Sequence, residues 1–242
     1  MRSNNGDLRM NFARITSLKG EFEAEGLSRD AVAAESAFAS RNGLAYLVKI
    51  GGCEAMSDMR FLQQQGIRSI VAPMIESAFA MQKYQDMLPD AAFDHVGVTI
   101  ETVGAVERIE AILDAGTKLT EVTVGRTDLT ASYGGHDVNS PETIEMVKTV
   151  ARAAGKRGLA TTMGGSINAQ TVAILNQDDV LRELIGAVET RKCVMPVAKF
   201  LEEGALADAF AVECALLDLQ LAAHGAIVEA ARSRAEALRS RA

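Results

Sequence analysis

The chain has 242 residues, 48% of them hydrophobic, and a formal net charge of −7. This length suits one α/β barrel or two small domains, and the acidic balance argues against a nucleic-acid partner. Three cysteines without CxxC spacing argue against a zinc site or a disulfide framework. We find no signal-peptide core and no apolar run of membrane-spanning length, so we expect a cytoplasmic protein without a membrane partner.

The first expected strand, near residues 18–23, alternates charged and apolar side chains with the period of a β-strand. Two interpretations stay open: the charged face is solvated, or it lies inside a barrel with its acids at the mouth of a site. On the second interpretation, Glu21 and Glu23 are candidates for proton transfer. The charged positions are Lys19, Glu21, Glu23 and Glu25.

Residues 45–50 are expected to form the next strand, with Lys49 near its end. A lysine there is either a surface residue whose stem packs along the strand or a positive charge in a site. As a point charge it would bind a carboxylate without the bidentate geometry of arginine. A further strand, nearly continuous in apolar residues, is expected at 67–74.

The central pair of strands, near 96–101 and 120–126, carries the strongest functional signal. The first strand ends in Glu101, a segment with helical spacing follows, and Asp128 comes just after the second strand. Strand, helix and strand at this separation predict a parallel βαβ unit, which places both carboxylates at neighbouring carboxyl ends. Two carboxylates repel unless a cation lies between them, so Mg²⁺ or Mn²⁺ is the expected metal.

The loop after the second of these strands is long, and such loops carry substrate contacts in barrels. His136 lies in this loop, as either a substrate contact or a solvated side chain. The last two expected strands lie near 159–163 and 184–190. After the second one, Arg191 supplies either an anion-binding charge or a structural ion pair with Glu189.

The segment from Gly204 to Arg241 predicts one long or broken helix that is apolar on several sides, and such a helix must be covered on several sides. We therefore expect residues 1–203 to form the barrel. Residues 204–242 would be a helical extension, in the same domain or swapped onto a neighbour in a homo-oligomer. Seven strands are readable, whereas a full barrel has eight. The missing strand would precede Lys19, so either the barrel is incomplete or a partner segment closes it.

Four stretches of the sequence together match the pattern of a known protein family. They are IET (100–102) followed by a helix, VGRTDLTASYG (124–134), GIRSIVAPMIESAFAM (66–81) and GKRGLATTMGG (155–165). Together they resemble the HpcH/HpaI aldolase and citrate lyase family, over roughly residues 18–200. The resemblance implies a TIM-type (β/α) barrel of the pyruvate and phosphoenolpyruvate type, with a C-terminal helix packed on a neighbouring subunit.

The resemblance also implies a chemistry, that of a metal-dependent carbon–carbon lyase or aldolase acting on a 2-oxo acid through a pyruvate enolate. Glu101 and Asp128 would hold the metal, and the backbone at Gly125, Arg126 and Thr127 would approach the substrate carboxylate. The chain departs from the family at two places. Lys49 stands where an arginine is common, and Ala24 is nearest to where a catalytic histidine is expected.

Three alternatives remain open on this evidence. The same pair of carboxylates would serve a citrate-lyase-like acyl-CoA lyase or a condensing enzyme that uses phosphoenolpyruvate. The third alternative is a non-catalytic barrel subunit, and its support is the absent histidine and the lysine at position 49.

Overall fold

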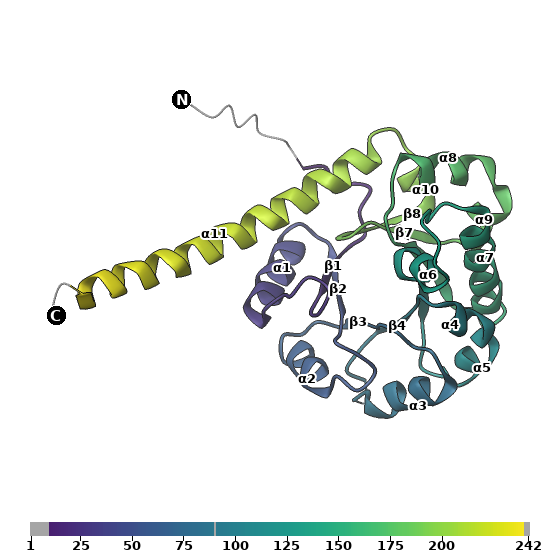
Figure 1. The fold of residues 1–242 in the computed structure, drawn as a ribbon, viewed down its shortest axis with the longest axis horizontal. Coiled ribbons are helices and arrows are strands. Elements are labelled where there is room, and N and C mark those ends of the chain that lie inside the picture. The colour runs from purple at the N-terminus through teal and green to yellow at the C-terminus, as the bar shows by residue number, and fades with distance from the viewer. Residues whose placement is uncertain (1–9, 90, 240–242) are drawn as a thin grey trace.

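Eight strands follow one another around a closed barrel in the order of the chain. The structure is a computed structural model that describes residues 10–89 and 91–239. Helices surround the barrel, as Figure 1 shows, so the expected TIM-type α/β fold is confirmed. The strands are β1 (Ser17–Glu21), β2 (Ala45–Lys49), β3 (Ser69–Ala72), β4 (His95–Ile100), β5 (Glu121–Gly125), β6 (Ala160–Gly164), β7 (Ala187–Glu189) and β8 (Cys193–Pro196).

The helices begin where the sequence supplies capping side chains. Ser28 accepts a hydrogen bond from the Ala31 amide, and Ser140 does the same for Thr143 with Pro141 in the first turn. The helices are α1 (Arg29–Arg41), α2 (Met56–Gln64), α3 (Ala78–Met87), α4 (Val103–Glu107), α5 (Ile109–Asp114), α6 (Arg126–Ser132), α7 (Pro141–Gly155), α8 (Ala169–Gln177), α9 (Asp179–Leu184), α10 (Val197–Phe200) and α11 (Ala205–Arg239).

The seven strands expected from the sequence, β1 to β7, pair in parallel with their chain neighbours. Glu21 pairs with Lys49, and Gly125 pairs with Gly164. This register brings the carboxyl ends of the strands to one edge. Residues that immediately follow a strand, such as Glu101, therefore share one mouth of the barrel.

The eighth strand lies where the sequence analysis did not look for it. β8 follows β7 after a short turn and runs antiparallel to both of its neighbours, so Val194 pairs with Glu189 on one side and Ser17 on the other. The expectation of a strand before Lys19, or of closure by a partner segment, is therefore wrong. The chain closes its own barrel because a hairpin supplies the last strand without a crossover helix.

The interior of the barrel is polar near its mouth. In β4 the outward residues Val96, Val98 and Ile100 are buried in the hydrophobic core, whereas Thr99 lines a cavity. Lys19 and Thr123 also face this cavity, from β1 and β5. The inner layer that branched apolar residues fill in most TIM barrels is here replaced by hydrophilic side chains. This replacement leaves room for a polar site.

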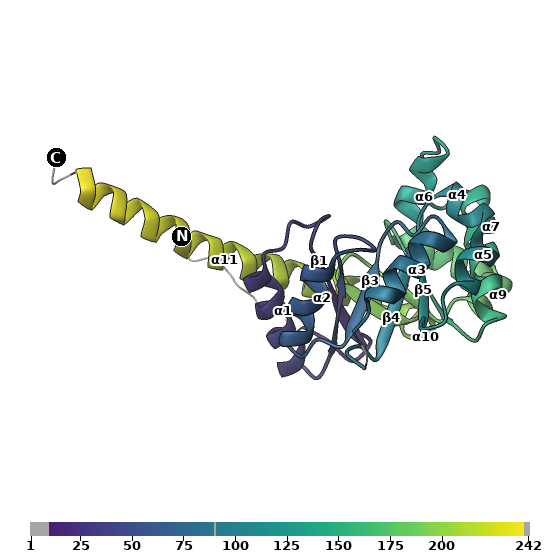
Figure 2. The same ribbon diagram turned by 90° about the horizontal axis from the view of Figure 1, so that it is seen from below.

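Helix α11 is docked along its first half and free along its second. Its buried stripe ends at Leu216, and the rest projects from the barrel past α1, as Figures 1 and 2 both show. Residues Ala205–Glu236 are long and apolar enough to cross a membrane by length and composition. The expectation that no segment reaches that threshold is therefore wrong. The buried stripe consists of Ala205, Ala209, Val212 and Leu216.

Candidate active site

A cavity of about 530 Å³ opens at the carboxyl ends of the parallel strands. Backbone of Gly125, Gly164 and Gly165 forms part of its wall. Its lining side chains carry both signs of charge, and several of them form ion pairs with one another. The charged lining residues are Lys19, Glu21, Lys49, Glu101, Asp128, Glu189, Arg191 and Glu213.

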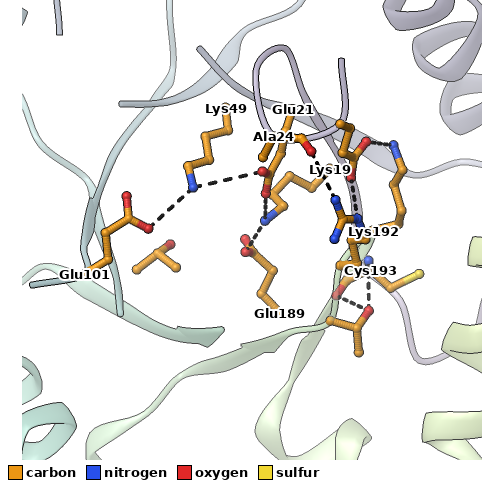
Figure 3. Close-up of polar contacts among 12 residues, drawn as sticks. Lys19, Glu21, Ala24, Lys49, Glu101, Glu189, Lys192 and Cys193 are labelled. Carbon is orange, nitrogen blue, oxygen red and sulfur yellow. Dashed lines mark hydrogen bonds and ion pairs between the residues drawn. The ribbon is translucent and has the colours of Figure 1, made fainter. Parts of the chain in front are cut away.

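Lys49 points into this cavity, so the interpretation of a surface lysine is not what the structure shows. Its Nζ atom lies 3.5 Å from Glu101 Oε2 and 4.0 Å from Glu21 Oε2. Figure 3 shows Lys49 between these two carboxylates. The side chain is 17% exposed. Lys49 is therefore a cation held between two carboxylates, with part of its ammonium group open to the cavity.

A second lysine, Lys19, lies deeper in the barrel. It forms ion pairs with Glu21, at 2.6 Å, and with Glu189. Burial alone would raise the pKa of Glu21, but the charges of Lys19 and then Lys49 outweigh it and hold that pKa below its usual range. Burial raises the pKa of Glu189, with Lys19 opposing the shift. Glu21 thus stays ionised, and the inner-face interpretation of the first strand is the one that the structure supports.

Glu101 is buried and held from two directions. Its Oε1 accepts a hydrogen bond of 2.9 Å from the Met74 amide, which adopts a left-handed φ of 52° to donate it. Burial raises the pKa of Glu101, and the charge of Asp128 adds to this against the opposing effects of Lys49 and the Met74 amide. A Cβ on Gly125 would lie 2.8 Å from Glu101 Oε2, so only glycine leaves room for this carboxylate.

The donor set fits Mg²⁺ or Mn²⁺ in its chemistry. Glu101 and Asp128 line the same cavity, and such metals take one or two protein carboxylates and leave positions for substrate and water. Burial is the main cause of the raised pKa of Glu101, and repulsion by Asp128 adds to it; a divalent cation would relieve this repulsion. Among the described residues, no group of three or more His, Cys, Asp or Glu side chains is arranged to hold a metal. A site here would thus rest on two carboxylates.

Arg126 has a different place from the one expected. Its side chain is fully buried behind the cavity, where it donates to the carbonyls of Gly164 and Gly165 and to Asn139 Oδ1. Burial lowers the pKa of Arg126 to about 10, which leaves it charged at neutral pH. The guanidinium group is therefore not available to substrate, because the protein itself occupies its donors, and the predicted substrate contact at this position concerns the backbone alone.

The backbone next to Arg126 does approach the cavity closely. Gly165 has a left-handed φ of 84°, and a Cβ there would lie 2.5 Å from the Thr127 nitrogen. Thr127 lines the cavity, and its hydroxyl is 3.1 Å from that of Ser166. The Gly125–Thr127 backbone and the Thr127 hydroxyl are thus placed to contact a ligand.

The remaining expected residues divide into two groups. Arg191 lines the rim of the cavity and pairs with Glu25 at 3.5 Å, so the alternative of a structural pair with Glu189 is wrong. Glu23 and His136 are exposed and are not among the residues that line the cavity. Their predicted parts in proton transfer and substrate contact are therefore not supported, since Glu23 lies in a turn and His136 in a loop, both outside the cavity lining.

Three charged lining residues were missed as site residues. Lys19 and Glu189 are signalled in the sequence, because Lys19 shares the face of Glu21 and Glu189 ends a strand. Glu213 could not be found this way. It belongs to α11, far along the chain, and only the docking of that helix brings it to the cavity.

No protein-family model and no curated protein matches the chain. Solved structures do match in fold. An HpcH/HpaI aldolase from Desulfitobacterium hafniense superposes with a TM-score of 0.59 at 17% identity, over 82% of each chain. An HpcH/HpaI aldolase/citrate lyase family protein from Burkholderia cenocepacia gives 0.59 at 16%, over 84% of each chain. The citrate synthase SbnG gives 0.58 at 13%, over 84% of this chain and 83% of that one. This chain therefore shares its barrel fold with HpcH/HpaI aldolases.

Proposed function

We propose that the protein is a carbon–carbon lyase of the aldolase type, dependent on Mg²⁺ or Mn²⁺ and acting on a 2-oxo acid. One observation carries the proposal. The Lys49 ammonium lies between the buried carboxylates of Glu21 and Glu101, in a cavity that Asp128 also lines, at the carboxyl ends of the strands where barrel enzymes place their sites. The fold shared with HpcH/HpaI aldolases agrees with this reading, as does the donor chemistry of Glu101 and Asp128.

Each residue then has a definite part. Glu101 and Asp128 hold the metal, and when bound the metal supplies positive charge that stabilises an enolate oxygen. Lys49 adds a second positive charge beside the same oxygen. The Gly125–Thr127 backbone and the Thr127 hydroxyl orient the substrate carboxylate, and Arg191 attracts it from the rim.

Proton transfer falls to Glu21, because it is the ionised carboxylate next to Lys49. It accepts the proton that leaves the methyl group when the enolate forms and returns the proton when the enolate is quenched. The ion pair with Lys19 keeps Glu21 oriented toward Lys49. Because the same pair lowers the pKa of Glu21, the proton resides there only briefly.

Deuterium exchange into the methyl group of pyruvate, with Mn²⁺ present, tests the proposal by NMR. We expect wild-type protein to catalyse exchange and the Glu101→Gln, Asp128→Asn double variant to lose both exchange and Mn²⁺ binding by calorimetry. Glu23→Gln is the matched control, since Glu23 is an exposed carboxylate outside the cavity. Absence of exchange at high protein concentration would favour the non-catalytic subunit, and Mn²⁺ affinity unchanged in the double variant would refute the metal site.

Assembly is part of the same proposal. We infer a cytoplasmic homo-oligomer in which the projecting half of α11 packs on a neighbouring subunit. The support is the apolar surface that this half exposes, which is unusual for a soluble monomer.

A further inference from the structure

The helix that projects from the barrel also builds part of the cavity. Phe210 and Glu213, both on α11, line the cavity beside Thr190 and Arg191. They lie on the docked half of the helix, before the buried stripe ends at Leu216. One wall of the site is thus supplied by a segment that follows the whole barrel in the chain.

Glu213 contacts the turn between β7 and β8 through a single oxygen. Its Oε1 atom accepts a hydrogen bond of 2.5 Å from the Thr190 hydroxyl and one of 2.9 Å from the Lys192 amide. The turn is closed further by the Thr190 amide, which donates to the Cys193 carbonyl at 2.9 Å. Arg191 lies between Thr190 and Lys192, the two residues that Glu213 contacts.

Arg191 has little else to fix it. Its side chain is 62% exposed, and its contacts are long, at 3.5 Å to Glu25 Oε1 and 3.3 Å to the Ala24 carbonyl. Exposed ion pairs of this kind orient a side chain weakly. The direction in which Arg191 leaves the backbone is therefore set mainly by the turn, and Glu213 clamps that turn on both sides of it.

We propose that Glu213 is a positioning residue for anion binding by Arg191, so that α11 sets the affinity of the site for the substrate carboxylate. This inference rests on the proposed function. Removal of the Glu213 carboxylate takes away the contact on both sides of Arg191, although the hydrogen bonds between Thr190 and Cys193 remain, and lets Arg191 leave the rim. Binding of the carboxylate weakens, while the groups around Lys49 and Glu101 are untouched. The effect falls on KM and not on kcat.

Four variants test this in the pyruvate exchange assay. Glu213→Ala should raise KM about tenfold, which corresponds to roughly 1.4 kcal/mol, and leave kcat within about twofold. Glu213→Gln should retain the wild-type KM, because its amide oxygen still accepts both bonds. Arg191→Ala should raise KM to a similar extent, and the double alanine variant should be no worse than Arg191→Ala alone. Asp218→Ala, at an exposed carboxylate on the same helix, is the matched control.

Additive effects in the double variant would overturn the inference, since Glu213 would then act other than through Arg191. A fall in kcat alone would also overturn it. Amide hydrogen exchange at Lys192 measures the contact with Glu213 independently of catalytic activity. We expect faster exchange in Glu213→Ala than in Glu213→Gln. If the wild-type protein catalyses no exchange into pyruvate but Glu213→Ala still loses amide protection at Lys192, the proposed function is refuted. The contact between Glu213 and the turn is then still supported. Unchanged protection refutes the clamp itself.

Discussion

Replacement of Leu217 and Leu221 by glutamate should split the assembly that we infer from α11. The projecting half carries large apolar side chains that are 37–68% exposed, so about half of each remains to be buried. Full burial of such a side chain stabilises by roughly 2 kcal/mol, which leaves about 1 kcal/mol for each and about 10 kcal/mol for two arms. Association itself costs about 4–15 kcal/mol. The side chains are Leu217, Leu219, Leu221, Ile227 and Val228.

The free energy gained by burial is therefore close to the cost of association, and the two substitutions should make association unfavourable. They remove about 2 kcal/mol of burial from each arm and about 4 kcal/mol from a symmetric pair, close to a thousandfold in affinity. Light scattering coupled to size exclusion, at micromolar concentration, measures the outcome, with Glu203→Gln as an exposed control. The subunit mass is 25.8 kDa. Wild-type protein eluting at that mass would refute this account of α11.

Three further predictions concern the barrel. Arg126→Met leaves carbonyls and an amide oxygen without donors, so we expect a loss of about 3–5 kcal/mol and a Tm lower by roughly 10 °C in calorimetry. The pKa of Glu21 is lowered on folding, so its stabilisation is present above about pH 4.3 and is lost at lower pH. The Tm deficit of Glu21→Gln should therefore shrink on acidification. The pKa of Glu101 is raised on folding, so its ionised form destabilises the fold near neutral pH. Glu101→Gln should therefore gain a few degrees in Tm near neutral pH, a gain that fades as the pH falls.

The parallel strands and the pairing of Glu101 with Asp128 at one mouth could be predicted because both follow from local periodicity. Alternation in 95–101 separates the core face from the cavity face without reference to the rest of the chain. Lys49 could be placed near the site on the same grounds, although its partner Glu21 could not be chosen over Glu23. That choice depends on where the strand ends, and it ends at Glu21.

The remaining features depend on contacts that sequence patterns do not encode. β8 has only four residues and follows a tight turn, so nothing in its composition separates it from an ordinary loop after β7. Arg126 lies within a motif that suggests ligand contact, yet its guanidinium group is directed inward, where two segments of backbone, at Val138 and at Gly164–Gly165, accept its hydrogen bonds. Glu213 reaches the site only through helix docking. In each case, the deciding partner is distant in the chain.

The direction of β8 also decides at which end of the barrel α11 leaves the molecule. A parallel eighth strand would send its following helix back toward the amino ends of the strands, away from the cavity. Since β8 runs in the other direction, α11 starts at the amino ends of the parallel strands, where Asp208 pairs with Arg14. It reaches the mouth of the barrel at Glu213 and projects beyond it. In the proposed assembly, a subunit that packs on the projecting half of α11 therefore lies at the end of the barrel that holds the cavity. The direction of a four-residue strand thus joins the helix proposed for subunit contact to the wall of the cavity, through Phe210 and Glu213.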